Sequence, residues 1–291
     1  MRRLVIILIL LLTNSLSFSQ NFKSDKFTSL QVEEMNTWQL LAYDGKNAFN
    51  GVAYTYSRPF HWQQRDWLRA GATAGLVGGL YLVDEQTSDW ARRQQDDIPT
   101  VISDFGWYFG SPQNNYGVTG GIYLYGLFTK SPEWRRTGVL MISSATAGGL
   151  LQQFLKSVTG RGRPETGVGK SEFRPFSGES GYRSFPSGHT ILSFTTAYAL
   201  AKHFDNPWVK AGIYTLGLVS PASRVWKGAH YLTDVVLSLA ITIATVEAVD
   251  RYLDTRNGYG EQRYGTKKPK QRSYSLSFSA TPNTVGLTLN F

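Results

Sequence analysis

The chain of 291 residues contains no cysteine and only four histidines. Without cysteine, disulfide bonds, thiolate nucleophiles and cysteine-ligated zinc sites are excluded. Disorder is not expected either, because 42% of the residues are hydrophobic and 14% are aromatic. The length suffices for one large domain with a sizeable core, or for one domain with extensions.

Acidic residues are in the minority, and the formal net charge is +9. A basic chain favours anionic partners, which are phosphorylated substrates, acidic lipid head groups or nucleic acid. The N-terminus has the pattern of an export signal, because two arginines precede a short apolar run, residues 4–12, and small residues precede a cleavage site after Ser19. We expect residues 1–19 to be a signal peptide, with an uncleaved anchor as the alternative. Both place the remainder in the membrane or periplasm of a bacterial envelope, on the non-cytoplasmic side, so no nucleic-acid partner is expected.

From residue 68 onward the chain consists of apolar segments rich in Gly and Ala, separated by polar breaks. Their length and composition favour helices over strands. The six segments are 68–83, 118–129, 137–155, 190–203, 209–220 and 234–253, and 98–110 is a weaker seventh. The sequence therefore predicts an all-α bundle of about six core helices over residues 68–253. Residues 20–67 are expected to be an N-terminal extension, with a short strand at 51–57.

Membrane insertion is left open by the sequence. Most segments are near or below the roughly 20 residues that a helix needs to span a bilayer. The mean hydropathy is −0.24, which is low for a chain built mainly of spanning helices. A compact membrane domain and a periplasmic domain lying on the membrane both remain open.

The C-terminal part has a different composition. Residues 254–272 are polar and basic, and we expect a solvated linker there. Residues 273–291 alternate apolar and polar positions on either side of a TPNT turn signal. This pattern predicts a small terminal β-hairpin, packed on the domain.

Three polar clusters stand out in the second half of the chain: 156–164 (KSVTGRGRP), 184–189 (SFPSGH) and 223–234 (SRVWKGAHYLTD). Each alone has an ordinary structural explanation, such as a cation at a helix end or a polar pair one helical turn apart. Together they supply what a phosphoryl group in transit requires, which is fixed positive charge and N–H donors around its oxygens.

Lys156, Arg163 and Arg224 supply the positive charge of this expected site, and a guanidinium group fits two phosphate oxygens at once. Ser187 and Gly188 open a predicted helix. The free backbone N–H groups of a helix N-terminus point at an anion, and Gly188 allows the ligand to approach closely. Ser187 can add a hydroxyl donor.

Two of the four histidines, His189 and His230, lie in these clusters. His230 precedes Asp234 by four residues, which predicts that both lie on one face of a helix. A carboxylate that holds one ring nitrogen leaves the other free to act as base or nucleophile. His189 is placed to protonate a leaving oxygen and then to activate water. His61 and His203 lack such neighbours and are interpreted as structural or surface residues.

A metal centre is not expected, because the carboxylates near the clusters show no repeated ligand spacing and three cations would repel a divalent ion. These carboxylates are Glu165, Glu172, Glu179 and Asp234. Ser187 is a poor candidate nucleophile, since a nucleophile elbow has glycine two residues before and after the serine, and here Phe185 and His189 occupy these positions.

The combined pattern resembles the three signature motifs of the type 2 phosphatidic acid phosphatase and vanadium haloperoxidase superfamily. All fixed positions occur in order, and the gaps between the motifs lie within the family's range. The match covers about residues 68–253. The motifs are Lys156-x6-Arg163-Pro164, Pro186-Ser187-Gly188-His189 and Ser223-Arg224-x5-His230-x3-Asp234.

The resemblance implies a helical bundle whose motifs meet in one pocket, and hydrolysis without a metal or other cofactor. It implies His230 as nucleophile, Asp234 as its orienting partner and His189 as general acid. It also implies that the phosphoryl group is held by Lys156, Arg163, Ser187, Gly188 and Arg224.

We therefore expect a phosphoric monoester or diphosphate hydrolase that acts through a phosphohistidine. The apolar helices favour a lipid phosphate as substrate, and the membrane or its surface as partner. Alternatives are a periplasmic acid phosphatase for soluble esters, a haloperoxidase in which His230 binds vanadate as cofactor, and a protein that binds anionic lipid without turnover. Residues 165–183 form either a loop over the site or, through Lys170, Arg174 and Arg183, a second anion site. The sequence does not give the oligomeric state.

Overall fold

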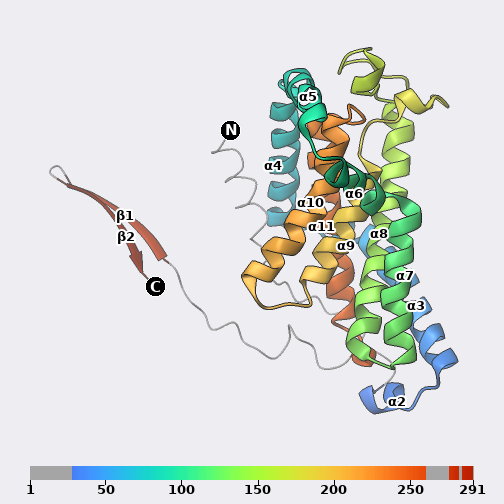
Figure 1. Cartoon of the computed structure of the whole chain (residues 1–291). Coiled ribbons are helices and arrows are strands. Elements are labelled where there is room, and N and C mark those ends of the chain that lie inside the picture. The colour runs from blue at the N-terminus through green and yellow to red at the C-terminus, as the bar shows by residue number, and fades with distance from the viewer. Residues whose placement is uncertain (1–27, 260–274, 282–283, 291) are drawn as a thin grey trace.

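The structure, a computed structural model of the whole chain, describes residues 28–259, 275–281 and 284–290. The expected all-α fold is confirmed: the described residues up to 259 form a bundle of helices (Figure 1). The predicted signal peptide, residues 1–19, lies outside the described residues, as do residues 260–272 of the predicted linker.

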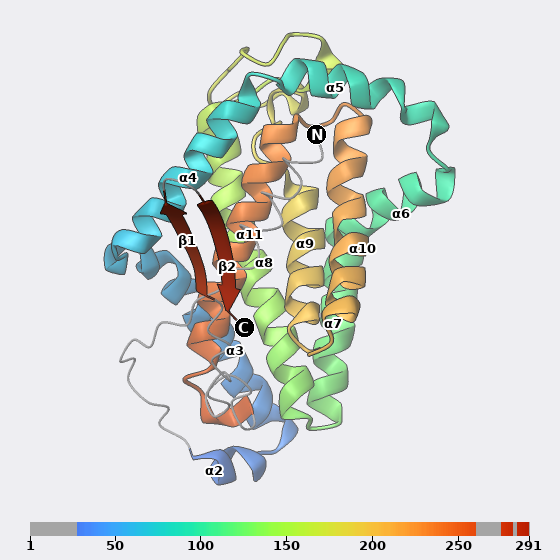
Figure 2. The ribbon, with the colours of Figure 1, turned by 90° about the vertical axis from the view of Figure 1, so that its left-hand side faces the viewer.

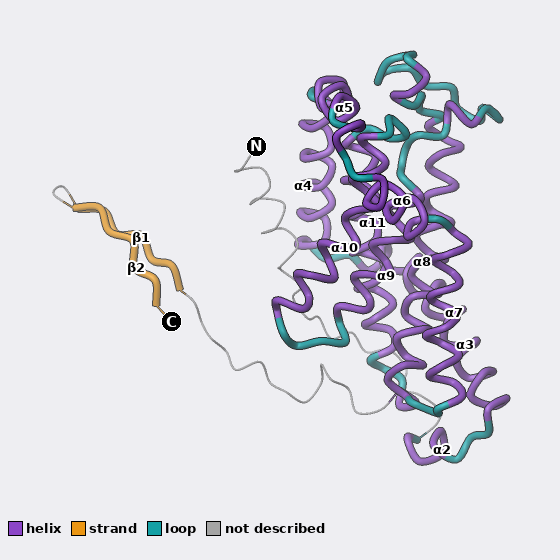
Figure 3. The backbone as a smooth tube through the Cα atoms, viewed as in Figure 1, coloured by secondary structure: helices purple, strands orange, loops and turns teal. Residues whose placement is uncertain are grey.

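Ten α-helices lie within the described residues (Figures 1 and 3). They are α2 (Ser29–Glu33), α3 (Thr37–Ser57), α4 (Gln64–Tyr81), α5 (Asp84–Arg93), α6 (Thr100–Gly110), α7 (Pro112–Phe128), α8 (Pro132–Thr159), α9 (Gly188–Ala201), α10 (Pro207–Trp226) and α11 (Leu232–Leu253). Each apolar segment that the sequence identified lies, apart from one or two residues at an end, in one of the helices α4 and α6 to α11. Most of these helices begin earlier than the apolar segment, because polar and capping residues form their first turns.

The predicted strand at 51–57 is wrong, because these residues are the last turns of α3. The Thr and Tyr residues there suit a strand, but helix α3 is already started by a capping box in which Asn36 and Gln39 bond each other's backbone N–H groups. Its buried side recurs every three or four residues, which is helical spacing, at Leu40, Tyr43, Asn47, Gly51 and Tyr54.

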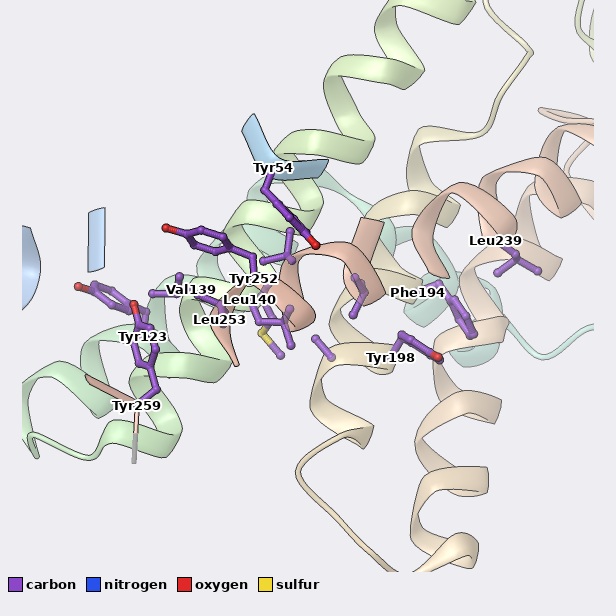
Figure 4. Close-up of a cluster of buried hydrophobic side chains, with 14 of the residues drawn as sticks. Tyr54, Tyr123, Val139, Leu140, Phe194, Tyr198, Leu239, Tyr252, Leu253 and Tyr259 are labelled. Atoms are coloured by element: carbon purple, nitrogen blue, oxygen red, sulfur yellow. The ribbon is translucent and has the colours of Figure 1, made fainter. Parts of the chain in front are cut away.

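The long helix α8 is the centre of the bundle and packs against α3, α7, α9 and α11. Figure 4 shows the apolar core, in which Val139 and Leu140 of α8 lie among aromatic side chains from other helices. Tyr54 of α3 and Tyr252 of α11 are among them, with ring centroids 5.8 Å apart. The expected N-terminal extension is therefore, from Thr37 on, part of the bundle.

A buried ion pair joins α3 to α8. The guanidinium of Arg135 donates two hydrogen bonds to Asp44, at 2.8 and 2.6 Å, and the hydroxyl of Tyr123 donates a third at 3.1 Å. The ring of Tyr259, in the 3-10 turn Asn257–Tyr259, lies 5.7 Å from the guanidinium carbon of Arg135. Tyr259 is buried, so the start of the predicted linker at residues 254–259 packs on the bundle rather than being solvated.

Two described helices, α8 and α11, are long and apolar enough to cross a membrane. More than half of the most apolar 18-residue window of each is buried against the rest of the bundle, as in the core helix of a folded domain.

The C-terminal residues form a two-stranded antiparallel hairpin of β1 (Ser275–Thr281) and β2 (Thr284–Asn290). Its register pairs Phe278 with Leu287 and Thr281 with Thr284. Thr281 and Thr284 are the first and last residues of the TPNT sequence.

Candidate active site

The ends of four helices carry the three motifs to one end of the bundle. These are the last turns of α8 and α10 and the first turns of α9 and α11 (Figures 1 and 2). Helix α5 lies at the same end (Figure 2). Opposite chain directions explain the convergence: α8 and α10 run toward this end, and α9 and α11 run away from it.

Lys156 lies in the last turn of α8, and its ammonium group donates a hydrogen bond to the carbonyl of Arg183. The side chain is almost fully buried. Burial, together with the charges of Arg163 and Arg183, lowers the pKa of Lys156 to about 7, although Asp234 acts in the opposite direction. A bound anion would favour the protonated lysine.

Helix α8 ends at Gly160, whose φ of 55° lies in the left-handed region. A Cβ atom at this position would lie 1.8 Å from the carbonyl oxygen of Arg174, so only glycine fits. The turn directs the chain to Arg163, which lies 3.3 Å from Glu165 through Nη1. Its Nε is buried and has no hydrogen-bond partner among the described residues. Arg163 therefore keeps donor capacity for an anion.

Arg224 is buried near the end of α10 and donates through Nε and Nη2 to Ser223 Oγ, both at 3.1 Å. Burial and the charge of Arg163 lower the pKa of Arg224 to about 10. Its backbone carbonyl accepts hydrogen bonds from Ala229 N–H at 3.0 Å and His230 N–H at 3.2 Å. One residue thus contributes a cation and fixes the backbone of the candidate nucleophile.

Ser187 precedes the first turn of α9, and its hydroxyl accepts a hydrogen bond from Thr190 at 3.0 Å. The first N–H groups of a helix have no intrahelical acceptor, so those of α9 are available to an anion. Gly188 lies against Gln152, since a Cβ atom here would be 3.3 Å from the Gln152 amide nitrogen.

His189 lies in the first turn of α9, and the basic residues of the motifs affect its pKa. Burial lowers its pKa to about 3, assisted by the charges of Arg224, His230, Lys156 and Arg163. Ser187 N–H, two residues earlier, donates to the backbone carbonyl of Asp234 at 3.3 Å, which places the start of α9 beside the third motif. The Nε2 of His189 is buried and has no partner among the described residues.

His230 and Asp234 are adjacent, but the prediction that both lie on a helix is wrong. His230 precedes α11, and Asp234 lies in its first turn, where its carboxylate accepts a hydrogen bond from Tyr231 N–H at 2.8 Å. This cap brings Oδ2 of Asp234 to 3.5 Å from Nδ1 of His230, which is longer than an ordinary hydrogen bond. Burial and the charges of Lys156 and Arg163 lower the pKa of His230 to about 4, although Asp234 opposes this shift.

The sequence reasoning missed the residues that hold Asp234. Arg161 donates to Asp234 Oδ1 at 2.7 Å and to Asp84 Oδ2 of α5 at 2.8 Å, and all three side chains are buried. Ser184 donates to the other oxygen of Asp234. Burial alone would raise the pKa of Asp234, but His230, Arg161 and Ser184 hold it below its ordinary value. The only sequence signal was the additional arginine inside the first motif; nothing marked Asp84.

A second omission is Trp107 of α6. Its ring centroid lies 4.5 Å from the guanidinium carbon of Arg224 and 5.2 Å from the ring centroid of His189. A cation over a tryptophan face is a favourable contact. Trp107 therefore borders the motif residues from an element outside all three motifs.

The remaining histidines have other surroundings. His61 is exposed and contacts the carbonyl of Ser57 at 2.9 Å, and His203 lies 3.3 Å from Glu133, near the end of α9 away from the motifs. Within the described residues, no three His, Asp or Glu side chains form a group that could hold a metal ion.

The basic residues of segment 165–183 form ion pairs and hydrogen bonds with the same segment or with neighbouring residues of the bundle. Arg174 lies 3.2 Å from Glu172 and 3.8 Å from Glu179, and Lys170 donates to the carbonyl of Leu82. Arg183 donates to Gln153 at 2.7 Å. These contacts favour a loop fastened to the bundle over a second anion site.

Residues 137–257 match the model of the PAP2 superfamily. Lipid A 1-phosphatase of Rhizobium etli is 37% identical over 108 residues, which cover 35% of this chain and 44% of that protein. Lipid A 1-phosphatase of Rhizobium johnstonii is 38% identical over 108 residues, covering 35% and 42%. The chain thus spans less than half of the length of these relatives.

Among solved structures, the crystal structure of Aquifex aeolicus LpxE is similar, with a TM-score of 0.42 and 19% identity. The similarity covers 55% of this chain and 92% of that one. The region matched by the family model contains the fixed residues of all three motifs. The resemblance drawn from the motifs is confirmed by the match of residues 137–257 to the PAP2 superfamily model.

Proposed function

We propose that this protein is a phosphatase of the bacterial cell envelope that hydrolyses the phosphate ester or diphosphate of a lipid through a phosphohistidine. The observation that carries the proposal is the convergence of His189, Arg224 and His230: Trp107 contacts both His189 and Arg224, and the carbonyl of Arg224 accepts a hydrogen bond from His230 N–H. The relatives named lipid A 1-phosphatase support a phosphorylated lipid as the substrate class.

The first step is attack by the unprotonated Nε2 of His230 on phosphorus. Asp234 faces Nδ1, so it favours the tautomer with the proton on Nδ1 and stabilises the positive ring that forms. The P–N bond forms as the ester P–O bond breaks, and His189 gives a proton to the leaving oxygen. Lys156, Arg163 and Arg224 stabilise the equatorial oxygens, together with the N–H groups of α9.

The second step returns the enzyme to its starting state. His189, now neutral, takes a proton from water as the water oxygen attacks phosphorus. The P–N bond breaks, inorganic phosphate forms and His230 recovers its lone pair. Atoms and charge balance over the two steps with water as the only co-reactant, and Lys156, Arg163 and Arg224 supply the positive charge that a metal ion would otherwise provide.

The low pKa of His189 is consistent with a role as general acid once substrate is bound. Burial and the charges of Arg224, Lys156 and Arg163 lower it, and a phosphate dianion placed among these residues would oppose the effect of the charges and raise it. The acid would thus become protonated when a substrate needs it. The pKa of His230, about 4, keeps the nucleophile neutral near pH 7.

The test is hydrolysis of p-nitrophenyl phosphate and of phosphatidate in detergent micelles by the purified full chain, with a chelator present. We expect release of phosphate, and a loss of at least about a thousandfold in kcat for His230→Ala and for His189→Ala. His61→Ala is the matched control and should stay within about twofold. Undiminished turnover by folded His230→Ala would contradict the proposal, and so would inactivation by the chelator.

A further inference from the structure

Helix α6 lies directly against the candidate active site through two glycines. A Cβ atom at Gly106 would lie 2.6 Å from Ser223 Cβ, next to Arg224. One at Gly110 would lie 3.0 Å from both Cβ and the carbonyl oxygen of His189. Glycines four residues apart lie on one face of a helix and allow the closest backbone approach. The sequence GWYFG thus fixes α6 as a wall of the site.

Trp107 marks the border between this site and the exterior. One part of its ring contacts the guanidinium of Arg224 and the ring of His189, yet 49% of the side chain remains exposed. Trp107 therefore offers a path from the site to the exterior for a group bonded to a phosphate among these residues. The indole is apolar except for its N–H, so this exit suits an apolar group better than a charged one.

The outward side of α6 continues as an apolar surface. Val101 is 75% exposed and Tyr108 is 59% exposed, with Ile102 and Phe105 also exposed between them. Asp104 is the only charged residue in the helix. Folded proteins rarely expose contiguous apolar residues unless a partner covers them.

We propose that this surface of α6 binds the hydrocarbon chain of a lipid phosphate whose phosphoryl group occupies the adjacent motif residues. The inference rests on the proposed phosphatase function and adds the place of the lipid's apolar part. Continuity argues for this occupant: Tyr108 shares a helix face with Val101 and Phe105, and it directly follows Trp107, which touches two of the motif residues. A lipid phosphate has the same order of parts, a charged end followed by an apolar chain.

The experiment compares two pairs of exposed apolar residues on two substrates. Val101→Ser with Phe105→Ser changes the α6 surface, and Phe49→Ser with Phe128→Ser removes two exposed apolar residues from α3 and α7. For phosphatidate in detergent micelles, we expect KM to rise about tenfold in the α6 variant only, as expected for lost apolar contact. For p-nitrophenyl phosphate, kcat/KM should stay within about twofold in both.

A second measurement uses the unaltered protein, so it does not depend on a variant that folds. A phosphatidate analogue with a photoreactive group in its acyl chain should label residues 100–110, and vanadate should reduce the labelling. Labelling elsewhere, or labelling that vanadate leaves unchanged, would overturn the inference.

The outcomes separate the inference from the function on which it rests. If the wild-type protein hydrolyses neither substrate, the proposed function fails. Hydrolysis of the soluble ester alone overturns the lipid inference and leaves a phosphatase. Equal KM increases in both variants would indicate general attachment to micelles, and a change in oligomeric state confined to the α6 variant would indicate a second copy; either result overturns the proposal.

Discussion

Arg161 donates a 2.8 Å hydrogen bond to Asp84, and with its other terminal nitrogen it binds Asp234, the carboxylate that faces His230. Asp84 also accepts hydrogen bonds from the backbone and hydroxyl of Thr233. The partners lie on α5, on the turn after α8 and on α11, so one buried cation connects three distant segments. Through Arg161, the orientation of Asp234 therefore depends on Asp84, a residue outside the three motifs.

Asp84→Asn should lower kcat by about tenfold and leave KM for p-nitrophenyl phosphate nearly unchanged. The amide removes a negative charge from Arg161, which then draws Asp234 away from His230 and weakens support for the positive ring. The measurement is kcat and KM per folded molecule, with thermal unfolding recorded alongside.

The matched control for Asp84 is Asp44→Asn. It also breaks a fully buried arginine–aspartate pair, with Arg135, but between α3 and α8 and outside the motifs. It should lower stability comparably, by about 3–5 kcal/mol, without reducing kcat of the folded fraction. Equal losses of kcat in both variants would mean that Asp84 acts only through stability.

Gly106→Ala and Gly110→Ala should each reduce kcat/KM on the soluble ester. The new methyl groups meet Ser223, Ser220 and His189 at distances that force α6 away from the site. Gly117→Ala on α7 is the control, because no atom lies within 4 Å of its Cβ position. Activity assays combined with fluorescence of the tryptophans would reveal the displacement; unchanged activity in both α6 variants would show that α6 is no wall of the site.

Binding of sulfate should take up protons near pH 8. Lys156, with a pKa of about 7, is mostly neutral at that pH, and an anion beside it raises the pKa and draws a proton from solvent. Sulfate keeps its charge at about pH 6 to 9, so the uptake belongs to the protein. Calorimetry in two buffers of different ionisation enthalpy measures it. The uptake should vanish in Lys156→Met and persist in Lys170→Met; persistence in both would contradict the assignment.

The sequence alone was enough to predict the helices that have continuous apolar faces and to identify the residues of the three motifs. It failed at 51–57, because Thr and Tyr favour strands locally while the packing of Tyr54 against Tyr252 favours a helix. It also placed His230 on a helix, since spacing of four suits a helical turn, whereas the contact with Asp234 arises from a helix cap.

Asp84 and Trp107 could not be found from the sequence for a different reason. Each acts through a partner more than 70 residues away, Arg161 for Asp84 and His189 for Trp107. A single aspartate in a polar helix, or one tryptophan in an aromatic segment, has no spacing that marks it. Only tertiary packing selects these residues from others of their kind.

The most direct test of the central claim is to trap the covalent intermediate. Rapid quenching during hydrolysis of a substrate labelled in its phosphate should leave acid-labile phosphate on the protein, and peptide mapping should locate it on His230. Loss of the label in His230→Ala, with the fold retained, is the predicted companion result. Label on any other residue, or turnover by His230→Ala, would contradict the account.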